Sequence, residues 1–528
     1  MVVPFLLNTA QMSFPAEVRR GFRRGMQSAL VNSAFLSFIL CVPLRELPAQ
    51  QAPVAEQQIS SITSQQLSPG ATRAYAEVLK LRIQPARQLL RTEPANTPGT
   101  LLVADCADFA ELVISQDAAH YEAVLSAQNN RLTILERATS SALRDYARAE
   151  IRLHQAVLQV TFGHEVVGAW NFRQTFQQVQ AVSQKYPDFL PARKTLGLLE
   201  FGIGSLPDGY HWFLRLLGLN GNIENGLRNL SLAATRPQDF QTESRIFLAL
   251  IHEAYYQRNQ EPAALIEALR RQQPDNLLYS FLEISYFKRQ HHADAALTAY
   301  RARPTGAAYV PTPYLRHMAA DLLLYQGQYA ASETENNQFL AEYRGRHYRK
   351  DAAFKCYLAA WMGGAPAARV AAYRQQIALD GPLEVEEDIY AQRFEQDALP
   401  LHPVLTRARL QIDGGYYRLA LNTLRSFQRT PALPHRDLIE EPYRRARAYQ
   451  GLGQLDSARL AYERTLAIAG DAPYYFAPQA ALQLGYFAQA AGQTARARQY
   501  FELVLHSPKH EYKNSSDAKA RVALRGLK

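Results

Sequence analysis

The chain has 528 residues, of which 47% are hydrophobic and 20% charged, a balance that excludes a protein disordered throughout. The length exceeds what one hydrophobic core usually supports, so we expect several domains or an array of repeats in which each unit packs only on its neighbours. The net charge of +10 is carried by arginines spread along the chain together with Asp and Glu, so we predict no nucleic-acid partner.

The first 49 residues have the order of a targeting segment. Four arginines between positions 19 and 24 precede an apolar stretch at 29–44, and the small-residue segment LPAQQA follows. Charge, apolar run and small residues in this order predict a signal peptide, so we expect an exported, periplasmic or envelope-associated protein. The alternative is an inner-membrane anchor through 29–44, which gives the chain a membrane association; that run is shorter than the roughly 20 residues that span a bilayer. Met1 and Met26 are both candidate starts.

Residues 50–70 are rich in Gln and Ser and predict a flexible linker. From 71 to 240 apolar residues recur at helical spacing, and Gly163 indicates a turn. We interpret 71–240 as an N-terminal region of degenerate helical repeats, 241–400 as a second set of helical repeats, and 401–528 as a C-terminal set.

The segment 186–234 is the most distinctive part of the chain. It contains a Gly-rich turn, a Leu-Pro-Asp-Gly break at 206–209 and a Gly-Leu pair at 226–227. It resembles a segment of the eukaryotic tetratricopeptide repeat protein 39 family, where a helix ends near a Leu-Pro and a Gly-containing turn leads to a Gly-Leu helix start. Members of that family act as adaptors, so the resemblance implies an adaptor and transfers no active-site residue.

A cluster of aromatic and basic side chains follows the break in this segment. It consists of Tyr210, His211, Trp212 and Arg215. Aromatic residues and arginine anchor many protein interfaces, so these four are our candidate partner-binding residues. The alternative is simple packing between adjacent helices.

A recurring frame of small residues and turns runs through the second half of the chain. Its clearest instance places a small residue, a turn glycine, a second small residue and an aromatic at Ala446, Gly453, Ala458 and Tyr462. Small residues are required where two helices approach closely. The same frame predicts turns at Gly221, Asn259, His291, Gly327, Gly363, Gly415 and Gly492. Successive turns are 32 to 39 residues apart, except for one step of 52 that contains an insertion at about 380–400.

This frame resembles the tetratricopeptide repeat (TPR), a helix-turn-helix unit of about 34 residues. We therefore interpret 241–400 as TPR-like repeats and 401–528 as C-terminal TPR repeats. We therefore predict an all-α fold, a right-handed α-solenoid of TPR-like helix-turn-helix repeats with roughly twenty or more helices. Pro262, Pro366, Pro442 and Pro473 are interpreted as lying near helix starts, where a missing N–H costs least. Strand signals are nearly absent.

One motif begins like a zinc-protease site. His164 and Glu165 match the start of HExxH, but Gly168 occupies the position of the second histidine, which leaves one ligand on that helix face. The chain also lacks GxSxG and P-loop motifs. We expect no catalytic residue and no cofactor.

Two further groups of residues are candidate metal ligands. His291, His292 and Asp294 could form a surface cluster, but they occupy a predicted turn, where polar residues are expected. Cys106 and Cys356 show no metal-ligand spacing and predict two buried thiols rather than a disulfide. We therefore predict no metal site.

The sequence is best interpreted as a non-catalytic TPR scaffold or adaptor that holds a protein or peptide partner in its groove. One alternative is an envelope substrate-binding protein on a helical-repeat frame, which predicts a pocket lined by aromatics and convergent polar groups. Another is an enzyme or an enzyme-associated subunit, which predicts perturbed titratable groups in one cleft. The sequence names neither the partner nor the oligomeric state.

Overall fold

The structure is a computed structural model. It describes residues 66–205, 218–256, 260–379, 381, 383, 385–397, 401–430, 432–508, 510 and 512–527. These residues form 24 α-helices and one short 3₁₀ helix, and no strand occurs among them. The predicted all-α fold is confirmed for the described chain, whereas the predicted signal segment at 1–49 lies outside it.

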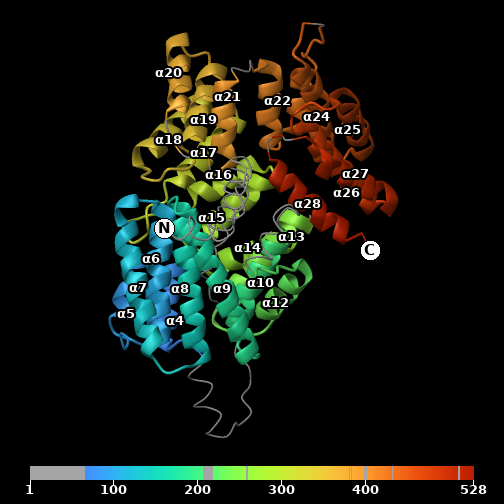
Figure 1. The fold of residues 1–528 in the computed structure, drawn as a ribbon. Helices are drawn as coiled ribbons and strands as arrows, with labels where there is room; N and C mark the ends of the chain where they lie inside the picture. The colour runs from blue at the N-terminus through green and yellow to red at the C-terminus, as the bar shows by residue number, and fades with distance from the viewer. Residues whose placement is uncertain are drawn as a thin grey trace, which may run out of the picture. The chain divides into compact units, whose positions relative to one another are not determined.

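The chain forms two compact units (Figure 1). Unit 1 comprises the described residues of Met1–Glu253, Arg258–Tyr279 and Pro304–Pro311. Unit 2 comprises those of Ala254–Gln257, Ser280–Arg303 and Thr312–Lys528.

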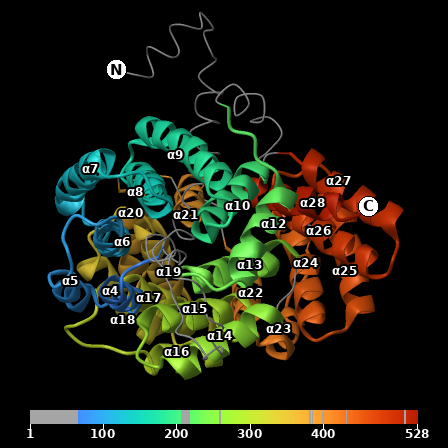
Figure 2. The same cartoon turned by 90° about the horizontal axis from the view of Figure 1, so that it is seen from below.

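Helices α4 to α14 lie mainly in unit 1. Their bounds are α4 (Pro69–Leu79), α5 (Ile83–Leu90), α6 (Pro98–Ser115), η1 (Ala118–His120), α7 (Tyr121–Arg137), α8 (Ala142–Thr161), α9 (Glu165–Lys185), α10 (Leu190–Gly204), α12 (Ile223–Thr235), α13 (Gln241–Tyr256) and α14 (Gln260–Gln272). Helices α4, α6 and α8 lie side by side in both views (Figures 1 and 2). Ser68, inside the predicted linker, already accepts a hydrogen bond from the backbone of Ala71 as the N-cap of α4.

Helix α15 begins in unit 1, and the helices after it belong to unit 2. The bounds are α15 (Leu277–Arg289), α16 (Ala293–Arg301), α17 (Tyr314–Tyr325), α18 (Tyr329–Glu342), α19 (Arg349–Met362), α20 (Ala367–Ala378), α21 (Glu386–Gln396), α22 (Pro403–Asp413), α23 (Tyr417–Leu424), α24 (His435–Gly451), α25 (Leu455–Ala469), α26 (Phe476–Ala490), α27 (Thr494–His506) and α28 (Lys513–Arg525). From α22 onward, the first helix of each pair packs on its own second helix and on the first helix of the next pair. This arrangement of stacked helix pairs is that of an α-solenoid.

Five of the predicted turns join helix pairs, whereas the turn predicted at Asn259 lies outside the described residues. Gly327, Gly415, Gly453 and Gly492 each follow a first helix with φ between +71° and +88°, the left-handed region that glycine adopts at little cost. His291 takes the same conformation, with φ +58°, between α15 and α16. The recurring frame therefore located the helix ends correctly at these positions.

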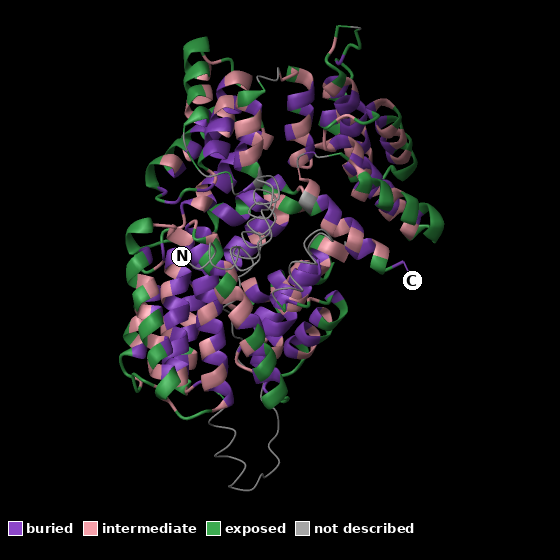
Figure 3. Cartoon of the chain, viewed as in Figure 1, coloured by how far each residue is buried: buried purple, intermediate pink, exposed green. Residues whose placement is uncertain are grey.

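The small and aromatic positions of the frame form the interior of each pair. Ala446, Ala458 and Tyr462 are fully buried in one core cluster between α24 and α25. Gly485 lies against Phe501 of α27, and a Cβ atom at Gly485 would come within 2.5 Å of that ring. Figure 3 shows the buried residues on the facing sides of the helices. Close approach of paired helices thus explains the recurrence of small residues.

One proline departs from the prediction. Pro442 lies inside α24, not near a helix start, whereas Pro262 lies in the first turn of α14, and Pro366 and Pro473 lie just before the starts of α20 and α26. An interior proline removes one backbone hydrogen bond from a helix. The core contacts of α24, which include Tyr443 beside the proline, compensate for that loss.

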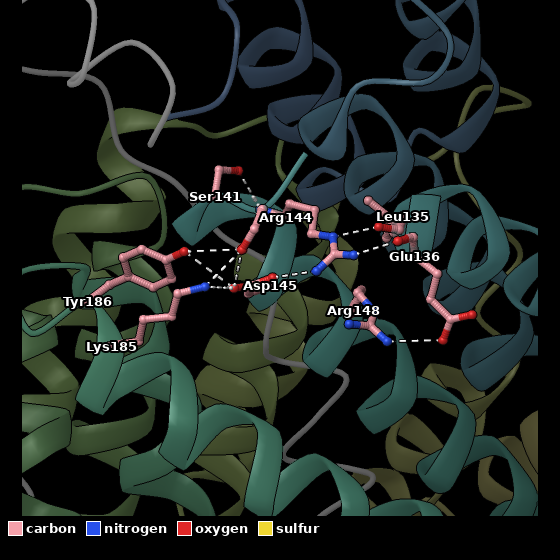
Figure 4. A network of polar contacts seen from close by, with 9 residues as sticks. Leu135, Glu136, Ser141, Arg144, Asp145, Arg148, Lys185 and Tyr186 are labelled. Atoms are coloured by element: carbon pink, nitrogen blue, oxygen red, sulfur yellow. Dashed lines mark hydrogen bonds and ion pairs between the residues drawn. The ribbon is translucent and has the colours of Figure 1, made fainter. Parts of the chain in front are cut away.

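The end of α7 is held by side chains from the two helices that follow it (Figure 4). Arg144 of α8 donates to the carbonyl oxygens of Leu135 at 2.5 Å and Glu136 at 2.8 Å, which have no partner within their own helix. The same guanidinium lies 2.7 Å from Asp145, and Lys185 of α9 is 3.1 Å from that carboxylate. A positive charge at a helix C-terminus is favourable, so this network fixes how α7, α8 and α9 meet.

Helices α10 and α12 contact each other through glycines. A Cβ atom at Gly197 would lie 2.7 Å from the carbonyl oxygen of Gly226, and one at Gly226 would lie 2.6 Å from the backbone nitrogen of Phe201. Gly221 similarly faces the backbone of Gly204. The glycines of the distinctive segment therefore permit backbone-to-backbone packing of the two helices.

Candidate functional site

The partner-binding residues predicted from sequence, Tyr210, His211, Trp212 and Arg215, lie outside the described residues. A candidate site must therefore be sought among the polar and aromatic groups of the two units.

A buried ion cluster joins three helices of unit 1. Lys194 Nζ lies 2.9 Å from a carboxylate oxygen of Glu150 and 3.1 Å from one of Glu243, and Tyr75 donates to Glu243 at 2.7 Å. These charged side chains are at most 3% exposed. Burial away from water raises the pKa of Glu243 to about 7. The charge of Lys194, which Glu243 shares with Glu150, offsets only part of this effect. The cluster is sealed from solvent, so it holds α8, α10 and α13 together.

A second polar cluster joins α15, α17 and α19 of unit 2. Asp321 is paired with Lys288 at 2.5 Å and Lys355 at 3.2 Å, and His317 Nε2 lies 3.1 Å from Asp351. Burial opposes ionisation of Asp321, but the two lysines and the histidine outweigh it and hold the pKa of this carboxyl well below its usual range. Each charge has an opposite charge beside it, which indicates a structural role.

His291, considered above as a metal ligand, has both ring nitrogens engaged. Its Nε2 atom is 2.9 Å from Arg447, which can only donate, so the Nδ1 atom carries the proton and donates to the carbonyl oxygen of Asp413 at 3.0 Å. Burial and the charge of Arg447 lower the pKa of His291, which keeps the ring neutral. His291 thus joins α15 to α22 and α24.

An open pocket in unit 2 gathers aromatic and arginine side chains. It encloses about 370 Å³ including its mouth. Its lining consists of Tyr390, Arg393, Phe394, Leu401, Arg436, Tyr474, Tyr475 and Phe476. We call this set the aromatic–arginine pocket. Aromatic walls with a few polar groups are typical of binding sites.

The inserted helix α21 supplies one wall of the pocket. Its Phe394 packs on Phe354 and Tyr357 of α19, with ring centroids 4.8 and 5.1 Å apart, and so is held by the core. The predicted insertion near 380–400 is therefore a helix that places Tyr390 and Arg393 at the pocket.

The opposite wall comes from the start of α26 and from α24. Tyr475 and Phe476 are in ring contact at 4.5 Å, and Tyr475 also meets Tyr512 edge to face at 5.5 Å. Arg444 of α24 donates to the Tyr475 hydroxyl at 2.8 Å. These contacts fix the orientation of the Tyr475 ring at the pocket edge.

Arginine and carboxylate side chains lie close together beside the pocket. Glu440 pairs with Arg444 at 2.7 Å and with Arg436 at 3.4 Å. Burial opposes ionisation of Glu440, but the charges of Arg444, Arg436 and Arg409 outweigh it and hold its pKa below the usual range. One further carboxylate, Asp437, lies 3.9 Å from Arg436. Asp413 also acts on Arg409 and Arg444, so the three guanidinium groups of Arg409, Arg436 and Arg444 lie near three carboxylates.

Arg409 is held in this group by a hydrogen bond to a tyrosine, and Asp413 is the carboxylate that acts on it electrostatically. Within the described chain its guanidinium has one hydrogen-bond partner, the Tyr390 hydroxyl at 3.2 Å, and no carboxylate at ion-pair distance. Its side chain is half-buried. The hydrogen bond to Tyr390 joins α22 to α21.

The sequence contained weak signals for this pocket. The insertion was recognised, and the aromatic run Tyr474, Tyr475 and Phe476 follows a predicted helix breaker. Neither feature indicated that the two would meet, because they are separated by about eighty residues. The buried thiols are confirmed: Cys106 and Cys356 are both buried, and they form no disulfide.

Two further classes of site were sought in the described part of the chain. No group of three or more His, Cys, Asp or Glu side chains is placed to hold a metal ion there. None of the described helices combines the length and apolar character needed to cross a membrane.

Comparison with known proteins yields little beyond the fold. No protein-family model and no curated protein matches the sequence. Among solved structures the chain is similar to the crystal structure of the APC/C hetero-tetramer Cut9-Hcn1, with 9% sequence identity and a TM-score of 0.26, over 90% of this chain and 99% of that one. At this TM-score the comparison adds nothing to the helix arrangement described above.

Proposed function

We propose that the chain is a non-catalytic TPR-like scaffold or adaptor that holds a protein or peptide partner, and that unit 2 carries the binding surface. The observation that supports this most directly is the aromatic–arginine pocket. Tyr, Trp and Arg dominate the energetics of protein interfaces. The pocket presents three tyrosines and two arginines on an array of helix pairs, a fold that commonly displays side chains for a partner.

The titratable groups also favour a scaffold. The Lys194 cluster is sealed inside unit 1, and the charges around Asp321 are matched within unit 2. Both clusters are explained by helix packing, because a buried charge is tolerated when it is paired and hydrogen-bonded.

For location, we propose export to the periplasm or cell envelope. The charge, apolar run and small residues of the first 49 positions support this proposal. The alternative is attachment to the inner membrane through 29–44. Mass spectrometry of the protein's own N-terminus distinguishes the two, since a start near Gln50 supports cleavage and an intact N-terminus supports an anchor.

The pocket also favours a second candidate, an envelope substrate-binding protein. That alternative predicted aromatic walls with convergent polar groups, as at Tyr390 and Arg436. Small-molecule sites enclose most of their ligand. This pocket is open, and its space of about 370 Å³ includes solvent outside it, so it does not enclose a small molecule in that way.

The experiment is site-specific photo-crosslinking of the full-length protein in cells. A photoreactive residue is introduced at Tyr474, in the pocket, or at Leu460 of α25, which is 60% exposed and does not line it. A discrete protein adduct from position 474 and none from 460 supports the proposal. No adduct from 474, together with a small molecule co-purifying with the chain, supports the second candidate and contradicts the scaffold.

A further inference from the structure

We infer that residues 304–311 form a strap that couples the two units, so that unit 1 and unit 2 unfold together only while the strap is docked in unit 1. The strap belongs to the connection between α16 and α17, which are helices of unit 2, yet it is part of unit 1. This inference goes beyond the proposed function, because it assigns a conformational role to a segment outside the candidate site.

The connection that contains the strap is long for a chain of helix pairs. Twelve residues, 302–313, separate α16 from α17. Helix–helix connections usually contain about two to eight residues. The strap is exposed from 305 to 308, but Val310 is only 6% exposed. A loop that only joins two helices stays at the surface as a rule, so burial of Val310 indicates a docked segment.

Two hydrogen bonds dock the strap. The Val310 N–H donates to the carbonyl oxygen of Leu81 at 2.8 Å, and the Tyr309 hydroxyl donates to the carbonyl oxygen of Asp275 at 2.8 Å. Burial raises the pKa of Tyr309, so the hydroxyl keeps the proton that it donates. Proline at 311 disfavours a helical backbone at Val310, so the N–H of this residue is presented to another segment.

The end of α4 and the loop before α15 build the docking position. Leu81 follows α4 with φ +61°, in the left-handed region where helix ends more often place glycine. Its side chain is 2% exposed, so packing holds the residue in that conformation. Lys80 pairs with Asp275 at 2.7 Å, and the guanidinium carbon of Arg82 lies 6.0 Å from the ring centroid of Tyr309. The strap therefore docks on a position that unit 1 has already fixed.

Docking of the strap constrains a helix pair of unit 2. The strap is joined to α16 through 302–303 and to α17 through 312–313. Tying the middle of a loop reduces the conformational entropy that is lost when its two ends come together, so the docked strap makes the pairing of α16 and α17 less costly. Helix α17 also carries Asp321 and His317 of the buried cluster that joins α15, α17 and α19. Unfolding of unit 1 would release the strap and thereby destabilise unit 2.

The test is pulsed hydrogen exchange of the full-length chain at increasing urea, with mass spectrometry of peptides from α8 in unit 1 and α19 in unit 2. The chain is compared with Tyr309→Ala, which removes the ring and the hydroxyl, and with Tyr309→Phe, which removes only the hydroxyl. There are two matched controls. Ala307→Ser alters the exposed part of the strap, and Val179→Ala removes buried methyl groups from α9 of unit 1, at a position that makes none of the strap contacts above.

We expect the α8 and α19 peptides of the parent chain to share one unfolding midpoint. Tyr309→Ala should separate the two midpoints by at least about 0.5 M urea, and Tyr309→Phe should separate them by less. Ala307→Ser should change neither midpoint, whereas Val179→Ala should lower the shared midpoint without dividing it. In the absence of urea, hydrogen exchange of the peptide that contains Val310 should be about tenfold faster in Tyr309→Ala than in the parent chain.

Three outcomes would overturn the inference. Two separate midpoints in the parent chain would show that the units are independent. One shared midpoint in both the parent chain and Tyr309→Ala would show that other contacts couple the units. Equal division of the midpoints by Val179→Ala and Tyr309→Ala would show that loss of stability in unit 1 alone explains the effect. The photo-crosslinking at Tyr474 tests the proposed function separately.

Discussion

The contact between α10 and α12 leads to a sharp prediction about stability. Gly226→Ala introduces a Cβ atom 2.6 Å from the backbone nitrogen and 3.0 Å from the Cα atom of Phe201, and 2.7 Å from the carbonyl oxygen of Gly197. All three neighbours are backbone atoms, so no side chain can rotate away. The two helices must separate or shift to accept one methyl group.

The magnitude follows from two opposing effects. Overpacking of a closely packed contact costs about 1–3 kcal/mol. Alanine in place of glycine within a helix gains about 1 kcal/mol from its better helix propensity. Because the neighbours of Gly226 cannot relax individually, we expect net destabilisation of unit 1 by about 1–2 kcal/mol. Gly202→Ala in α10 is the matched control: a Cβ atom there has no neighbour within 4 Å, so it should be neutral or stabilising by up to about 1 kcal/mol.

The assay is urea unfolding of the full-length chain followed by circular dichroism at the helix signal, with tryptophan fluorescence as a second probe. Two probes are required because two units need not unfold together. A Gly226→Ala variant as stable as Gly202→Ala, or more stable than the parent chain, would refute the claim that backbone contact between α10 and α12 requires glycine.

Further outcomes follow from other buried positions, each measured by urea unfolding. Lys194→Met should destabilise unit 1 by about 3–5 kcal/mol, because Glu150 and Glu243 lose their shared cation; an unchanged midpoint would contradict this role. Burial raises the pKa of Glu243 from 4.5 to about 7, so its contribution to stability is complete below about pH 4.5 and is lost as the pH rises to about 7. Glu243→Gln should remove this pH dependence of the free energy of unfolding, whose slope is at most about 1.4 kcal/mol per pH unit. Phe501→Ala should cost about 3–5 kcal/mol because the ring is fully buried, and Gly492→Ala about 1 kcal/mol because its φ is +71°; values near zero would contradict either.

Much of the fold was predictable because the constraints are local. Gly453 and Gly492 were recognised as turns since a left-handed residue after a helix is usually glycine. Ala458 and Tyr462 were recognised as interior positions because a repeated pair of helices must approach closely at the same places. Pro442 was placed wrongly, since core packing of α24 compensates for the missing hydrogen bond and no local signal reveals that packing.

The candidate site was largely unpredictable for the opposite reason. Tyr390, Arg436 and Tyr475 belong to an inserted helix, a repeat helix and a turn, and only their packing brings them to one pocket. The hydrogen bond from Arg409 to Tyr390 likewise joins two different helices and could not be predicted from the sequence. The cluster at 210–215, which the sequence suggested as a partner-binding site, stays a prediction.

The sequence by itself determined the class of this protein: an all-helical chain of repeated pairs, with turns at fixed glycines and two buried thiols. These properties follow from helix periodicity, backbone conformation and burial, each of which depends on residues within one or two turns. Only the tertiary structure decided which arginines pair with which carboxylates and which aromatics line one pocket. Ion pairing and pocket formation depend on distances between side chains far apart in the chain, and those distances exist only after the helices have packed.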